Sequence, residues 1–186
     1  MALINEKLIN NSLAAALSSI EIYNKPDFKY REEIFTILII NAWELLLKAK
    51  ILKDASYDVD SLYIFDKQGG YKVSRNGTPL TIEINGAMNK VGLAQEVADN
   101  IRVLVEIRDS AVHFYHNGSL SYVLYTLGVA SLQNYQKLMK MWFDKSLLDY
   151  NFYILPLGFM YNFKTLSQLE LDKEPKAISS LIQSVT

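Results

Sequence analysis

Hydrophobic residues recur at three- and four-residue intervals in four long segments of this chain, the spacing that places them on one face of an α-helix. The segments cover about residues 4–23, 30–53, 101–116 and 120–143. The second segment is apolar almost all round, which is typical of a helix at the centre of a domain. The third and fourth are joined by a short link, so we expect antiparallel neighbours. The pattern predicts a mainly α-helical bundle of four to five helices.

Residues 54–91 interrupt the helical pattern. They hold four of the eight glycines, in one Gly-Gly and two Asn-Gly dipeptides, beside short β-rich runs such as SLYIF, YKVS and LTIEI. This predicts a small β-hairpin or three-strand insertion between two helices. The aromatic stretch at 150–163 either caps the bundle or forms a partner surface. We expect a single domain over residues 1–186, in which 147–186 form a C-terminal capping segment.

Composition narrows the possible functions. The chain has 186 residues, of which 50% are hydrophobic, and no cysteine, so it can bury a sizeable core but forms no disulfide. A formal net charge of −1 provides no overall basic field, so nucleic acid must bind to a local patch. Two histidines three residues apart are a poor ligand set, and we expect no metal and no cofactor. The N-terminus lacks a signal-peptide layout, and we expect a cytoplasmic protein with no membrane span.

One segment carries candidate chemistry. Residues 101–116 are rich in core-type apolar side chains, yet they include Arg108, Asp109 and His113. A charged pair and an imidazole in such a run are costly to bury unless they are paired or used. Histidine also suits acid–base chemistry near neutral pH, which makes His113 the first candidate. The other histidine of the chain, His116, lies at the end of the same segment.

Helix geometry limits how these groups can meet. Asp109 and His113 are four residues apart, so they share a helix face, where the carboxylate can orient the imidazole and favour its protonated form. Arg108 and His113 are five apart, roughly 140° around the helix. They meet only if the guanidinium reaches round, the helix end distorts, or a second copy of the chain supplies the partner. The alternative is a surface Asp–His pair, with Arg108 bound to a carboxylate such as Glu106.

The second predicted helix carries three polar residues on one stripe. Asn41, Glu44 and Lys48 are spaced by three and then four positions, which places them on a single helix face. The stripe either faces the Arg108–His113 site across a helix interface or lies in solvent with a Glu44–Lys48 pair.

The predicted insertion combines basic and aromatic residues. Lys67, Lys72 and Arg75 occur close to Tyr63 and Tyr71 in the sequence. Cations that contact phosphates and rings on which bases stack make up a surface for single-stranded RNA. The alternative is that these residues only solvate a hairpin.

Three stretches together resemble a known family. They are KPDFKYREEIFTILIINAWELLLKAKIL, NIRVLVEIRDSAVHFY and YNFYILPLGF, and the match covers about residues 5–165. They resemble an uncharacterised domain family assigned to the HEPN superfamily, whose members carry an arginine followed after four to six residues by a histidine. In this chain that motif is RDSAVH, from Arg108 to His113.

The resemblance implies a HEPN-like helical domain that forms a homodimer, with two motifs facing each other across one cleft. Active members are metal-independent endoribonucleases of toxin–antitoxin and antiviral defence systems, which implies RNA as substrate and an antitoxin or other regulatory protein as partner. His113 would transfer protons, Arg108 would hold phosphate oxygens and Asp109 would orient the imidazole. Other members keep the fold without activity, so the alternative is an inactive module that binds RNA, nucleotides or protein. The candidate RNA contacts are Asn41, Glu44, Lys48, Lys72 and Arg75.

Overall fold

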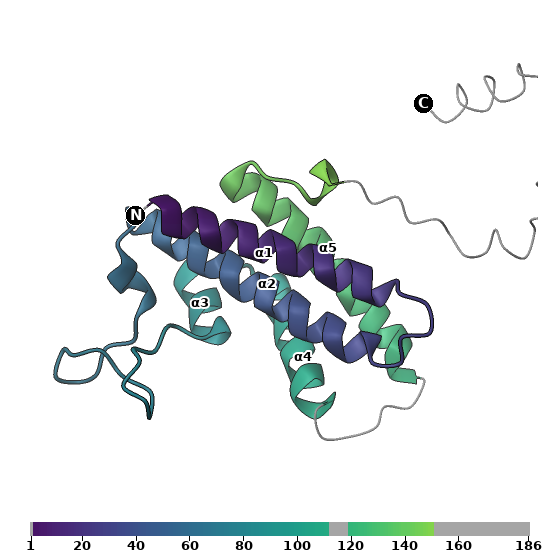
Figure 1. The fold of residues 1–186 in the computed structure, drawn as a ribbon, viewed down its shortest axis with the longest axis horizontal. Helices are drawn as coiled ribbons and strands as arrows, with labels where there is room; N and C mark the ends of the chain where they lie inside the picture. Colours follow the sequence, from purple (N-terminus) through teal and green to yellow (C-terminus); the bar gives the residue numbers. More distant parts are fainter. Residues whose placement is uncertain (1, 112–118, 151–186) are drawn as a thin grey trace, which may run out of the picture. The chain divides into compact units, whose positions relative to one another are not determined.

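The computed structural model describes residues 2–111 and 119–150. Within these ranges the chain forms five α-helices and two short 3-10 helices, with no β-strand (Figure 1). The mainly helical bundle predicted from the hydrophobic pattern is confirmed. The elements in order are α1 (Ala2–Tyr23), α2 (Arg31–Asp54), η1 (Val59–Leu62), α3 (Ile84–Val91), α4 (Gln95–Ala111), α5 (Ser119–Phe143) and η2 (Leu147–Asp149).

The helix α2 is the centre of the bundle. It contacts α1, α3, α4 and α5, and α1 lies alongside it over most of its length (Figure 1). Trp43 and Leu46 are completely buried in its middle. Its first turn carries Glu32 and Glu33 and its last turn carries Lys53, charges that suit the two ends of the helix dipole. The apolar pattern of this segment therefore predicted its central position correctly.

A small polar network crosses the core between α1, α2 and α5. The Ser12 hydroxyl donates to the Ala42 carbonyl oxygen at 2.7 Å and lies 2.6 Å from the Tyr135 hydroxyl. Since the serine has one proton to donate, the tyrosine donates in the second bond. Trp43 Nε1 donates to Ser131 Oγ at 2.8 Å, and its ring meets Tyr135 edge-on at 5.5 Å. These pairings fix how the three helices are rotated relative to one another.

Tyr135→Phe tests this network. We expect a loss of about 1–2 kcal/mol in the free energy of unfolding, because the variant removes a buried hydrogen bond and leaves the Ser12 oxygen without its donor. Urea denaturation followed by circular dichroism measures the change. Tyr30→Phe is the matched control, since Tyr30 is exposed and its variant should stay within about 0.5 kcal/mol of wild type. Equal stabilities of the two variants would contradict a stabilising role for the network.

The region predicted to hold a β-hairpin, residues 54–91, differs from the prediction. Its last part is the helix α3, which ends at Gly92 in a left-handed conformation with a φ of 68°. Between η1 and α3 the structure contains isolated antiparallel bridges in place of strands. They join Tyr63 with Thr81, Phe65 with Tyr71, and Val73 with Pro79.

Three backbone hydrogen bonds explain why no strand forms here. The Ile64 amide donates to Leu80 O at 3.0 Å, the Leu80 amide to Lys72 O at 2.8 Å, and the Lys72 amide to Ile64 O at 2.8 Å. Each of the three segments therefore pairs with both others in a closed ring, and no two of them run side by side for long. The predicted hairpin is not confirmed, because its β-rich runs form this ring of bridges.

The third predicted helix begins earlier than its apolar pattern indicated. The helix α4 starts at Gln95, whereas the prediction began at residue 101. Residues 112–118, which include the predicted end of this helix, lie outside the described residues.

The compact unit that contains the bundle is Met1–Asp149, and a second unit begins at Tyr150. Of the predicted capping segment at 147–186, the structure describes only η2 and the residue after it. The expectation of a single domain stays a prediction. In the described part of the chain, none of the helices combines the length and the apolar character needed to cross a membrane.

Candidate functional site

The charged pair of the sequence motif lies in the last turns of α4. Arg108 Nε donates to Asp109 Oδ1 at 2.9 Å, and Arg108 Nη2 lies 2.9 Å from the same oxygen. The side chains are 33% and 63% exposed, so both groups are accessible to solvent. Ile101, Leu104 and Ile107 of the same helix are buried, and Arg108 follows Leu104 by four residues, so it lies at the edge of this buried face. The local sequence thus places an arginine at the surface of an otherwise anchored helix.

The structure tests one of the contacts that the sequence suggested for this motif. Arg108 does pair with a carboxylate, but with Asp109, while Glu106 is exposed and no contact joins it to Arg108 within the described residues. His113 and His116 lie outside the described residues. The expected contacts of Asp109 and Arg108 with His113 therefore stay predictions.

One residue of the polar stripe on α2, Lys48, contacts the irregular insertion. Lys48 Nζ donates to Glu44 Oε1 at 2.6 Å and to Thr81 Oγ1 at 3.0 Å. Asn41 is exposed on the same face. In the part of the chain that the structure describes, no contact joins this stripe to Arg108. The Glu44–Lys48 pair, which we expected if the stripe lies in solvent, is present. The hydrogen bond from Lys48 to Thr81 also connects α2 with the insertion.

The insertion gathers three aromatic rings on its surface. Tyr71 lies 5.0 Å from Tyr63 and 5.2 Å from Phe65, measured between ring centroids. The Tyr71 hydroxyl donates to Asp60 Oδ1 at 2.6 Å, and this hydrogen bond raises the pKa of the phenol. Lys72, which follows Tyr71 directly in the sequence, is exposed. A carboxylate therefore lies directly beside the rings that the sequence suggested as a basic–aromatic surface.

Arg75 is exposed in the turn between the segment of Lys72 and the segment of Leu80 in the insertion. The Ser74 amide and the Thr78 carbonyl oxygen close this turn at 2.8 Å, and Gly77 adopts a φ of 79° within it. The guanidinium group thus lies at the tip of a short, closed loop, where phosphate groups can reach it. Among the described residues, no group of three His, Asp or Glu side chains is placed to hold a metal ion.

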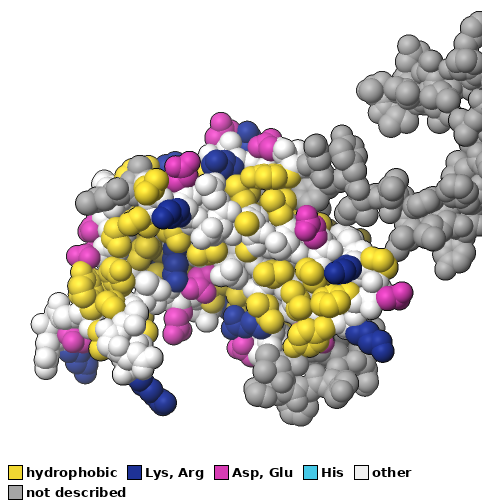
Figure 2. All heavy atoms as spheres, viewed as in Figure 1, with side chains coloured by type: hydrophobic (Ala, Val, Ile, Leu, Met, Phe, Trp, Pro, Cys, Tyr) yellow, Lys and Arg dark blue, Asp and Glu magenta, His cyan; other side chains and the backbone are white. Residues whose placement is uncertain are grey.

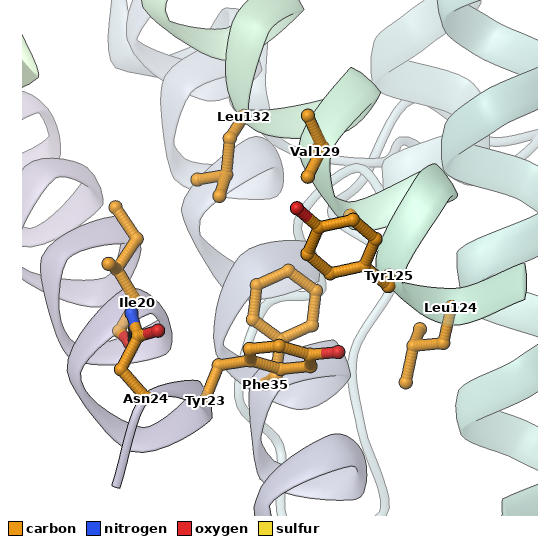
Figure 3. Close-up of a pocket in the computed structure, with 9 residues that line it drawn as sticks. Ile20, Tyr23, Asn24, Phe35, Leu124, Tyr125, Val129 and Leu132 are labelled. Atoms are coloured by element: carbon orange, nitrogen blue, oxygen red, sulfur yellow. Dashed lines mark hydrogen bonds between the residues drawn. The ribbon is translucent and has the colours of Figure 1, made fainter. Parts of the chain in front are cut away.

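A cavity of about 140 Å³ lies between α1, α2 and α5 (Figure 3). Tyr23 from the end of α1, Phe35 from the start of α2 and Tyr125 from α5 converge on it. The Tyr23 ring lies 5.2 Å from Phe35 and 6.4 Å from Tyr125, and the three rings form its aromatic part. The remaining lining residues are Ile20, Asn24, Leu124, Gly128, Val129 and Leu132.

Gly128 shapes this cavity. A Cβ atom at this position would lie 2.8 Å from Phe35 Cε1 and Cζ, closer than packed side chains approach. The glycine therefore lets the phenyl ring lie directly against the backbone of α5. At the rim, the Arg31 guanidinium lies 5.7 Å from the centre of the Tyr23 ring. Burial, and then the nearby Glu32 carboxylate, raise the pKa of the Tyr23 phenol.

Sequence reasoning missed this cavity because its walls come from three distant segments. A single signal was visible beforehand: Gly128 interrupts an otherwise regular helical pattern. A glycine inside a helix is less favourable than alanine by about 1 kcal/mol, so its presence often has a packing reason. The two tyrosines carried no such signal, because tyrosine is common among the 186 residues of this chain.

Comparison with known proteins gives one informative result. No curated protein and no solved structure matches the chain significantly. The model of a family described as a domain of unknown function, DUF3644, matches residues 7–186. That match includes nearly the whole chain, both the bundle and the segment after it. The chain therefore belongs to the DUF3644 family.

Proposed function

We propose that this protein is a metal-independent endoribonuclease of HEPN type, with Arg108 and His113 as its catalytic residues. The observation that supports this most is the position of Arg108. Its side chain is 33% exposed near the end of α4, beside the buried Leu104 one turn earlier, and its partner is its own neighbour Asp109. An arginine presented in this way is available to an anionic ligand. The link between this motif and RNA comes from the resemblance to the HEPN superfamily.

The proposed reaction uses a nucleophile that the RNA itself supplies. His113 takes the proton from a 2′-hydroxyl group, whose oxygen attacks the adjacent phosphorus atom. The bond from phosphorus to the 5′-oxygen of the next nucleotide breaks, and His113 returns the proton to that oxygen. The products are a 2′,3′-cyclic phosphate and a 5′-hydroxyl. Each step conserves charge and needs no further reactant.

Arg108 stabilises the transition state in this proposal. Asp109 engages the Nε and Nη2 side of the guanidinium, which leaves the Nη1 hydrogens for phosphate oxygens. Donors held in place before the reaction stabilise developing charge better than groups that must reorient. Asp109 thus positions the arginine, in addition to the role toward His113 that the sequence suggested.

We further propose that the protein acts as a homodimer. Arg108 and His113 are separated by roughly 140° around an ideal helix, so one chain brings them together poorly. A second copy lets the arginine of one protomer serve the histidine of the other. Such an interface should bury at least ~1,000 Å² in total.

The proposed RNA path extends over the exposed cations of the insertion, and Figure 2 shows basic side chains in this region at the lower left. Lys72 and Arg75 are exposed and are the best candidates for phosphate contacts there. Lys48 is already engaged by Glu44 and Thr81, so we assign it a weaker part in binding. Asn41 is exposed beside this pair and can bond to a base or sugar.

An inactive module that binds RNA or protein is the second candidate. The observation that favours it is the Arg108–Asp109 pair itself, because a satisfied surface pair is also what a purely structural arginine makes. Activity against RNA separates the two candidates.

The purified protein is expected to cut single-stranded RNA in the presence of EDTA. The 5′ fragment should end in a 2′,3′-cyclic phosphate, because the 2′-oxygen is the nucleophile. The same sequence in 2′-deoxyribose should stay intact, since it lacks that oxygen. Mass spectrometry of the fragments measures both results. Cleavage of the deoxyribose strand, or loss of activity in EDTA, would contradict the proposed chemistry.

A further inference from the structure

We infer that the cavity lined by Tyr23, Phe35 and Tyr125 binds one unpaired base of the RNA. This inference rests on the proposed function, because it takes RNA as the ligand. It adds a second site to the arginine at the end of α4. Nothing in the sequence motif or in the family match assigns a role to this cavity.

Size and shape favour a single flat ring. The cavity measures about 140 Å³, and cavities of about 150 Å³ are known to hold benzene. Three of its lining side chains are aromatic, and Figure 3 shows Tyr23 and Tyr125 bordering the same space with Phe35 behind them. A six-membered ring fits this volume. Bases taken out of a single strand commonly stack on aromatic side chains in this way.

The polar groups at the rim favour a heteroaromatic ring over a hydrocarbon side chain. In the described part of the chain, the Tyr23 and Tyr125 hydroxyls have no hydrogen-bond partner. Asn24 Nδ2 donates to the Ile20 carbonyl oxygen at 2.8 Å, which leaves its Oδ1 as an acceptor. The edge of a base carries both donors and acceptors that can bond to such groups. A partner's leucine or phenylalanine offers none.

The charges around the cavity favour a neutral ring with phosphates outside it. Arg31 already lies over one face of Tyr23, which argues against a cationic ligand on that ring. Glu32 acts on the same phenol and offsets the arginine, so an anion gains little inside. Lys25 is exposed after the end of α1 and, with Arg31, can contact the flanking phosphates.

One hydrogen bond connects α4, which carries Arg108, with α5, which lines the cavity. Asn100 Nδ2 donates to the Leu127 carbonyl oxygen at 3.1 Å, and this contact sets the register of α4 against α5. Tyr125 and Gly128 lie within one turn of Leu127. Arg108 lies about two turns beyond Asn100, roughly 12 Å along the helix axis.

Binding of a fluorescein-labelled 2′-O-methyl octauridylate tests the inference, because blocked 2′-oxygens prevent cleavage. Tyr125→Ala should weaken binding by about 5- to 100-fold, the range for loss of one base–aromatic stack. Tyr30→Ala is the matched control, since it removes an exposed tyrosine outside the cavity and should change the dissociation constant by less than about twofold. A strand of the same length that is abasic at every position should bind wild type and Tyr125→Ala with equal affinity, because it has no base to place in the cavity.

The outcomes separate this inference from the proposed function. Equal loss in Tyr125→Ala and Tyr30→Ala overturns the cavity assignment, and the ribonuclease proposal stands if the wild type still cuts RNA. A loss confined to Tyr125→Ala supports the assignment, even for a protein that binds RNA without cutting it.

Discussion

Arg108→Ala and His113→Ala should each slow RNA cleavage by about 100-fold or more, the range expected when a transition-state donor or a general acid–base is removed. The arginine variant removes the charge that stabilises the phosphorane, and the histidine variant removes the group that moves the proton. Initial rates with a fluorescent single-stranded RNA in EDTA measure both effects. Each variant must keep the melting temperature of wild type, so that a slower rate reports on the chemistry.

Two matched variants make this prediction specific. His116→Ala removes the other imidazole of the same segment and should stay near the wild-type rate, since it lies outside the motif. Asp109→Asn keeps the shape but weakens the hold on Arg108, so its loss should be smaller than that of the arginine variant. Folded His113→Ala that cuts RNA as fast as wild type would show that the active site lies elsewhere.

Trp43→Ala should lower the free energy of unfolding by about 3–5 kcal/mol, the usual effect of truncating a buried tryptophan. The side chain is completely buried, meets Tyr135 edge-on and donates to Ser131, so the variant leaves both a cavity and an unpaired hydroxyl. At this chain length the loss corresponds to a melting temperature lower by roughly 6–20 °C. Differential scanning calorimetry measures it.

Trp142→Ala is the control for this stability prediction. Trp142 is half-buried at the end of α5, where the Lys50 ammonium lies 5.8 Å from its ring centre. Its truncation opens no enclosed cavity and should have a clearly smaller effect. A destabilisation of Trp142→Ala equal to that of Trp43→Ala would contradict the central position of α2.

The long helices could be predicted because their signal is local. An apolar stripe at helical spacing, repeated over five or six turns, leaves few alternatives, and α2 and α5 match their predicted ranges to within one residue. The start of α4 was missed because Gln95–Asn100 are mostly polar, and their helical state depends on what the helix packs against.

The insertion could not be predicted from its β-rich runs. Propensity indicated extended backbone for LTIEI, but that run ends where α3 begins, at Ile84, which is buried against the bundle. The ring formed by Ile64, Lys72 and Leu80 depends on three segments that meet in space. Such an arrangement leaves no periodic trace in the sequence, since each residue only needs a free amide and carbonyl.

The candidate site was predictable to the extent that it is local. The sequence placed Arg108 and Asp109 near the end of one helix but did not predict their pairing, and it gave the Glu44–Lys48 pair as one of two alternatives. The contact of Lys48 with Thr81 could not be predicted, because it depends on where the insertion folds back against α2. The aromatic cavity likewise requires three helices to be in place.

The most direct test of the central claim uses a DNA strand that contains one ribonucleotide. Wild-type protein in EDTA should cut this strand at the single ribose and nowhere else, leaving a 2′,3′-cyclic phosphate there. His113→Ala should leave it intact over the same time. Cutting at deoxyribose positions, or equal cutting by the two proteins, would contradict a ribonuclease that works through His113 and the 2′-hydroxyl.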